Sequence, residues 1–142
     1  MKLHIITIGK PKLTYAQAGW EEYISRLKHY HTLRITHIAD KYNDSPHLLE
    51  AAGAAYIVGL VIAGTELSSV KLAHFIENRN QKGREVAFIV GGPDGLPTDV
   101  ITACDLQWSF SKLTFPHDLA MVILAESLYR ASTIAGGQPY HR

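Results

Sequence analysis

Two stretches toward the carboxyl end carry residues that could do chemistry. Gly91, Gly92 and Gly95 lie in a short run directly after the apolar segment 85–90. Glycine lets the backbone approach a ligand closely and adopt a positive φ angle. The chain ends in Tyr-His-Arg at residues 140–142. An imidazole titrates near physiological pH, and a guanidinium holds a phosphate or stabilises developing negative charge. The two stretches therefore indicate ligand binding and polar catalysis.

The glycine-rich run follows a segment that reads as a strand. Residues 85–90 are almost all apolar and are bounded by turn signals, which is typical of a buried parallel strand. In open α/β sheets, ligands bind just outside the carboxyl ends of such strands. The run is not GxGxxG, a P-loop or a kinase loop, so a tight turn between strand and helix explains it equally well when it is taken alone.

The rest of the chain alternates between predicted strands and helices. Alternation of this kind predicts an α/β fold with a mainly parallel sheet and helices on both faces. The predicted strands are 3–9, 33–38, 56–62, 85–90 and 106–111. The predicted helices are 15–30, 69–82, about 98–104 and 118–134, with one more short helix expected within 41–55.

Several local details of these elements are also predicted. Thr14 and Gln17 fit a capping box at the start of the first helix. Its buried face is expected to include Ala18, Tyr23, Leu27 and Tyr30. Residues 63–67 are expected to form a loop at the end of the third strand, and Ser68 or Ser69 and Gly83 are expected to begin and end the helix between them.

Composition favours one ordinary globular domain over residues 1–142, with 46% hydrophobic and 19% charged residues. We expect a cytoplasmic protein, because the chain shows no signal peptide and no apolar run long enough for a membrane span. Cys104 is the only cysteine, so a disulfide within the chain is excluded. No metal site is expected, since no cysteine or carboxylate completes a ligand set with the histidines near residues 29–37.

Positive charge is concentrated in the amino-terminal part of the chain. The net charge is +1, but residues 1–41 carry seven Lys or Arg side chains against three Asp or Glu. A basic patch there could meet phosphates, and a solvated mixed surface explains it about as well.

Four short motifs occur in a fixed order and together resemble one known family. They are VGGPDGL at 90–96, SFSKLTFPH at 109–117, AESLYRA at 125–131 and PYHR at 139–142. In this order the chain resembles the large-subunit ribosomal RNA pseudouridine N3-methyltransferases, which belong to the trefoil-knotted SPOUT class. The resemblance extends to residues 1–9, so it spans nearly the whole chain. It implies a carboxyl-terminal trefoil knot, which no periodicity in the sequence reveals.

The resemblance also implies a cofactor, S-adenosyl-L-methionine, bound by loops after the third, fourth and fifth strands. Its adenine needs an apolar slot with backbone hydrogen bonds. Because the sulfonium is positive, the Lys112 ammonium is expected to point away while its backbone serves the ligand. A purely structural role in the core remains open for Phe110, Leu113 and Phe115. The matching positions are Leu60, Gly91, Gly92, Phe110, Ser111, Lys112, Leu113, Thr114 and Phe115.

The implied reaction is methyl transfer to N3 of a pseudouridine in ribosomal RNA. That nitrogen carries a proton, so the reaction needs a base or a group that stabilises the uracil anion. No metal is required, because a sulfonium is already a good leaving group. The candidate catalytic residues are His117, Arg130, Tyr140, His141 and Arg142. The general base among them is left open: His117 could instead cap the last helix, Arg130 could pair with Glu126, and Tyr140 could simply pack.

The last predicted helix is apolar around much of its circumference, which indicates burial on more than one side. The family is homodimeric, so a partner subunit is expected there, and the tail of one subunit could complete the site of the other. The expected RNA partner is the assembled ribosome, since the small net charge suits shape recognition better than binding of free RNA.

The sequence departs from the family pattern in two places. The segment between the second and third strands is shorter than in relatives, and Val61 and Thr65 replace a usual acidic residue and lysine. Two alternatives therefore remain: a knotted methyltransferase with another RNA target, or an inactive relative that only binds ribosomes.

Overall fold

The structure is a computed structural model that describes residues 1–141. Its five strands form one sheet in the order β2-β1-β4-β3-β5, and every neighbouring pair is parallel. Parallel strands end at the same edge of the sheet, so the loops after them gather on one side. The strands are β1 (Lys2–Ile8), β2 (Thr32–Ile38), β3 (Tyr56–Glu66), β4 (Val86–Val90) and β5 (Leu106–Ser109).

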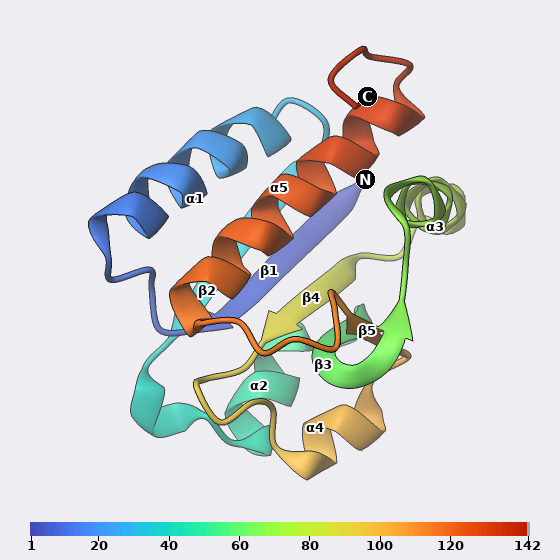
Figure 1. Cartoon of the computed structure of the whole chain (residues 1–142). Helices are drawn as coiled ribbons and strands as arrows, with labels where there is room; N and C mark the ends of the chain where they lie inside the picture. Colours follow the sequence, from blue (N-terminus) through green and yellow to red (C-terminus); the bar gives the residue numbers. More distant parts are fainter. Residues whose placement is uncertain (142) are drawn as a thin grey trace.

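Helices cover both faces of the sheet (Figure 1). The larger core cluster lies under α1 (Thr14–Leu27), α3 (Ser69–Lys82) and α5 (His117–Ala135). The smaller cluster lies under α2 (Ser45–Ala52) and α4 (Thr98–Ala103). The predicted α/β class, parallel sheet and two-sided covering are confirmed, while the trefoil knot stays a prediction from the family resemblance.

Strand β3 is longer than its apolar run suggested, so the predicted loop at 63–67 is wrong. Both Leu60 and Thr65 pair with Trp108 of β5, and the intervening residues bulge out. Gly64 makes this close return possible, because a Cβ there would lie 2.6 Å from the Gln107 carbonyl oxygen. The pairing partner is remote in sequence, which is why local pattern did not reveal it.

The predicted start of α1 is confirmed to within one residue, but the predicted capping box and most of the predicted buried face are wrong. The helix begins after Leu13 without a side-chain cap, and the Gln17 amide instead donates to loop carbonyls. The Asp118 carboxylate of α5 accepts from the two loop amides just before the helix and anchors its start from outside. The buried residues are Ala16, Trp20, Ile24 and Leu27, so only Leu27 of the expected face is buried.

The ends of α3 agree with prediction. Ser68 accepts a hydrogen bond from the Lys71 amide, and Gly83 adopts the left-handed conformation at φ 73° that ends the helix. Just beyond β2, a short 3₁₀ turn η1 (Asp40–Tyr42) leads into α2, which confirms a short helix in this polar segment.

Candidate functional site

A cavity of about 270 Å³ opens at the carboxyl edge of the sheet. The middle of β3 (residues 60–62), the ends of β4 and β5 with the loops after them, and the start of α5 supply its walls. This is the place where open parallel sheets bind ligands. In Figure 1, the connections after β4 and β5 pass close to each other here, below α5.

All the predicted cofactor residues line this cavity except Lys112. Lys112 is exposed, in agreement with the expectation that its ammonium points away. The loop that carries it is held by its own serines: Ser109 Oγ donates to the Ser111 carbonyl at 2.8 Å, and Ser111 Oγ accepts from the Leu113 amide at 3.0 Å. The loop backbone is therefore fixed before any ligand arrives.

The lining suits an adenosyl sulfonium. Apolar side chains of Leu60, Phe110 and Phe115 offer an adenine slot, and loop backbones offer hydrogen bonds. Among the described lining residues, no Lys or Arg faces the cavity, and Asp94 contributes a carboxylate. Trp108 also lines it, and its buried indole N–H has no partner among residues 1–141. An unpaired buried donor beside a cavity is the kind of group that a ligand satisfies.

His117 is the catalytic candidate that lines the cavity in its own chain. Its Nε2 lies 2.5 Å from the Ile8 carbonyl oxygen. A carbonyl only accepts, so Nε2 carries the proton, and the neutral ring keeps its free lone pair on Nδ1. His117 is the first residue of α5 but makes no capping bond, so the alternative role as a helix cap is wrong.

Asp118, the residue after His117, bonds the start of α5 to the β1–α1 connection. The Asp118 carboxylate is buried and accepts from the backbone amides of Lys12 at 2.8 Å and Leu13 at 2.6 Å. Together with the bond from His117 to Ile8, this fixes the loop after β1 against the cavity rim. The sequence did not single out Asp118, because its partners are more than a hundred residues away.

The other described catalytic candidates gather at the far end of α5. Arg130 bonds Glu126 at 2.7 Å, and Tyr140 packs edge-on against Tyr129 with ring centroids 4.7 Å apart. His141 lies 3.2 Å from the Arg130 guanidinium. The alternatives of pairing for Arg130 and packing for Tyr140 thus describe this chain. Arg142 lies outside the described residues.

The tail cluster is remote from the cavity within one chain. His117 and Arg130 are thirteen residues apart on a continuous helix, which corresponds to about 20 Å along its axis. Figure 1 shows the tail and the cavity loops at opposite ends of α5. The structure therefore does not bring Arg130, Tyr140 and His141 to the cavity of their own chain.

The environment of Tyr140 keeps its phenol protonated. Burial raises the pKa of Tyr140, and contact with Tyr23 and the carboxylate of Glu126 raises it further. The hydroxyl donates to Glu126 at 3.3 Å. In this arrangement Tyr140 is a hydrogen-bond donor and not a base. The pKa of Arg130 is also raised, chiefly by its bond to Glu126, so its charge is secure.

Several cavity residues were missed from sequence. All but Ala120, which lies on α5, are close in sequence to the predicted ones, so that signal was available in the element pattern. They are Val61, Ile62, Val90, Pro93, Asp94, Trp108, Ser109 and Ala120.

Neither a membrane span nor a metal cluster is found in the part of the chain that the structure describes. No helix within residues 1–141 combines the length and apolar character needed to cross a bilayer. Over the same residues, no group of three or more His, Cys, Asp or Glu side chains could hold a metal ion.

The chain is similar to characterised and solved proteins over its whole length. It is 47% identical to the ribosomal RNA large subunit methyltransferase H of Deinococcus deserti, with 100% of both chains covered. It is 44% identical to the protein of the same name in Deinococcus radiodurans, with 100% of this chain and 99% of that one covered.

A solved structure shares the fold at low sequence identity. The probable methylase family protein of Haemophilus influenzae matches with a TM-score of 0.57 and 13% identity. The match covers 95% of this chain and 66% of that one, and it supports the fold alone.

The family model described as "Predicted SPOUT methyltransferase" matches residues 1–141. With this match and full-length relatives above 40% identity, the chain belongs to the SPOUT methyltransferase family.

Proposed function

We propose that this protein is a homodimeric methyltransferase that transfers the methyl group of S-adenosyl-L-methionine to N3 of a pseudouridine in large-subunit ribosomal RNA. The observation that carries the proposal is the convergence of the middle of β3 and the loops after β4 and β5 into one cavity. The names of the Deinococcus relatives support the RNA target. We further propose that residues 1–142 act as one domain, in the cytoplasm where ribosomes are available.

The cavity residues named from sequence hold the cofactor in this proposal. Leu60, Leu113 and Phe115 flank the adenine, and the backbones at Gly91 and Gly92 approach the ligand closely. Bound there, S-adenosylmethionine supplies an activated methyl group. Asp94 lies on the same wall and favours a positive ligand. Ile62 and Leu113 are 53% and 68% exposed, so the apolar surface at the cavity is available for contact with a ligand or a second subunit.

The substrate nitrogen must lose its proton for the methyl transfer. His117 is held by Ile8 in the tautomer that leaves Nδ1 able to accept a proton or a hydrogen bond. Arginine and tyrosine donors are suited to the uracil oxygens as negative charge develops there. Those donors, Arg130 and Tyr140, lie about 20 Å away in the same chain.

A second subunit resolves this separation. In a two-fold dimer, the tail of each chain can reach the cavity of its partner. The surface of α5 supports such a contact: Leu119, Val122 and Ile123 are half-exposed and lie outside both core clusters. We therefore assign Arg130, Tyr140, His141 and Arg142 to the partner's site.

Calorimetry with S-adenosylmethionine tests the cavity. The unmodified protein should bind, and Ala120→Trp should bind at least about tenfold more weakly, since an indole would occupy the cavity. Ala103→Trp is the matched control, because Ala103 is exposed on α4 and outside the lining. Equal binding by Ala120→Trp and the unmodified protein would remove the cavity as the cofactor site.

The RNA target is tested separately. Ribosomes and transfer RNA are incubated with the protein and labelled methyl donor, and mass spectrometry locates the added methyl group. Label on a pseudouridine of large-subunit RNA is the expected result. Label only on transfer RNA favours another knotted methyltransferase, and ribosome cosedimentation without label favours an inactive relative.

A further inference from the structure

The segment 39–47 borders the cavity through direct contacts. Asn43 donates its side-chain amide to the Gly95 carbonyl at 3.3 Å, and Gly95 lines the cavity. At the other side of the segment, Asp40 pairs with Lys12 at 3.2 Å. This short piece of chain therefore lies between the glycine loop, which lines the cavity, and the β1–α1 connection, which is bonded to the start of α5.

The same segment presents an exposed aromatic stack. The rings of Tyr42 and His47 lie nearly parallel, with centroids 4.3 Å apart and an angle of 22°. Tyr42 is 40% exposed although it is a large ring. Lys41 places its ammonium 5.0 Å from the centre of the Tyr42 ring. An exposed ring braced by a second ring is a surface on which an unpaired base can stack.

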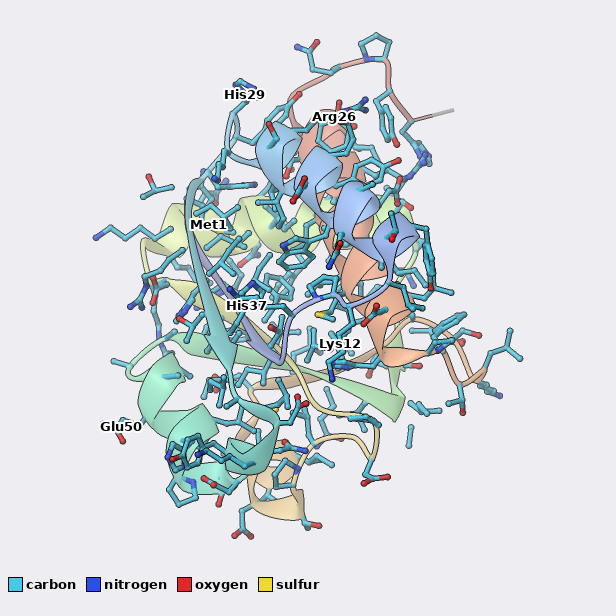
Figure 2. The ribbon with its side chains drawn as sticks, turned by 90° about the vertical axis from the view of Figure 1, so that its left-hand side faces the viewer. Met1, Lys12, Arg26, His29, His37 and Glu50 are labelled. Atoms are coloured by element: carbon cyan, nitrogen blue, oxygen red, sulfur yellow. The ribbon has the colours of Figure 1, made fainter. Side chains whose placement is uncertain are left out.

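Three exposed lysines lie in this segment and in the neighbouring β1–α1 connection. Lys10 and Lys12 lie on the β1–α1 connection, and Lys41 lies in η1; all three are exposed. Figure 2 shows Lys12 close to the ends of β1 and β2. Its partner Asp40 is 59% exposed and Lys12 itself 73%, so their ion pair contributes little. A phosphate can replace the Asp40 carboxylate at small cost.

The remaining acid of the segment is already engaged. Asp44 accepts from the His47 amide at 2.9 Å and begins α2. It also contacts the His47 ring at 2.6 Å, which fixes the ring that braces Tyr42. The start of α2 thus holds the stack in place, and the Asp44 carboxylate is bonded within the segment.

We propose that residues 39–47, together with Lys10 and Lys12, form the surface on which RNA beside the target base docks. A flanking unpaired base stacks on Tyr42 once the Lys41 ammonium leaves its place over the ring for a phosphate, and Lys10 and Lys12 contact further phosphates. The proposal rests on the proposed RNA methyltransferase function and adds to it the place where the substrate strand is held. RNA is favoured over a protein partner because the segment that carries the ring contacts the glycine loop of the proposed methyl-donor cavity, to which an extruded base must come for methylation.

The test compares Tyr42→Ala, Tyr42→Phe and Lys41→Ala in steady-state methylation of ribosomes. Tyr42→Ala should raise KM for ribosomes about tenfold, because it removes one stacking contact. Tyr42→Phe should behave like the unmodified protein, since the ring remains. Lys41→Ala should raise KM and reduce its salt dependence. Lys82→Ala is the charge-matched control on α3, whose carboxyl end lies at the opposite edge of the sheet.

Two further measurements separate docking from the other claims. Calorimetry should give the same affinity for S-adenosylmethionine in all variants, and kcat should not change. Cosedimentation with ribosomes measures docking even if methylation fails, so loss of catalysis alone removes only the proposed function. Three results would each overturn the docking surface. The first is an unchanged KM and cosedimentation for Tyr42→Ala, and the second is no cosedimentation by the unmodified protein. The third is a parallel loss of cofactor affinity in the variants.

Discussion

Replacement of Asp118 by alanine should destabilise the fold and disturb the cavity rim together. Its buried carboxylate accepts two backbone amides, from Lys12 at 2.8 Å and Leu13 at 2.6 Å. Hydrogen bonds to charged groups contribute about 1.5–3 kcal/mol each. The two bonds share one oxygen, and water can reach the exposed loop after the change, so the sum is not fully additive. We expect a loss of about 3 kcal/mol in the free energy of unfolding.

The measurement is urea unfolding at fixed protein concentration, since the stability of the proposed dimer depends on concentration. In thermal unfolding the same loss corresponds to about 6–12 °C for a chain of this size. Asp118→Asn keeps one acceptor oxygen and should lose less. Asp99→Ala is the control, because Asp99 is exposed in the first turn of α4 and should cost only a few tenths of a kcal/mol. An Asp118→Ala protein as stable as the Asp99→Ala protein would refute the anchoring role.

Two more predictions concern the interior. Gly59→Ala should cost about 2 kcal/mol, because its Cβ would lie 2.4 Å from the Cys104 sulfur; in a double-mutant cycle by urea unfolding, Cys104→Ala should recover part of the loss, and strict additivity would refute this contact. Stability should also fall as the pH drops. Burial lowers the pKa of His31 from 6.5 to about 4. As the pH falls, the unfolded chain therefore takes up a proton before the folded chain does. The contribution of the neutral His31 ring to the free energy of unfolding is present above pH 6.5 and is lost toward pH 4. His31→Gln, which can keep the bond to Ser132, should lessen the fall between about pH 7.5 and about pH 5. The fall should not vanish, since burial lowers the pKa of histidines on β1 and β2 too. An unchanged fall in the variant would contradict the assignment.

Sequence reasoning succeeded where the fold depends on short segments. The apolar strands are bounded by turn residues, and parallel strands bring their ends to one edge, so the pattern predicts that the loops after them lie together. A shared ligand site for Gly91 and Leu113 was implied only by the family resemblance, and both residues line the cavity. It failed where the capping or the boundary of an element depends on contacts with residues that are distant in sequence. The start of α1 is anchored by Asp118, and the end of β3 is extended by its pairing with β5.

The tail illustrates a different limit. Tyr140 and Arg130 were singled out for their chemistry, yet within one chain both bond Glu126 and lie against each other at the end of α5. A motif states which side chains are present but not how far apart the fold holds them. The length of α5 shows that the tail cluster and the cavity of one chain lie apart, which is the separation that the proposed dimer resolves.

Subunit complementation tests most directly whether the cavity of one chain works with the tail of the other. Ala120→Trp keeps its tail but has a filled cavity, and a chain that ends at Gln138 keeps its cavity but lacks the tail. Each alone should leave ribosomes unmethylated. When the two are refolded together, one site in each mixed dimer is whole, and about a quarter of the unmodified activity should return. Mixed dimers that form but stay inactive, or full activity in the chain ending at Gln138, would contradict the account.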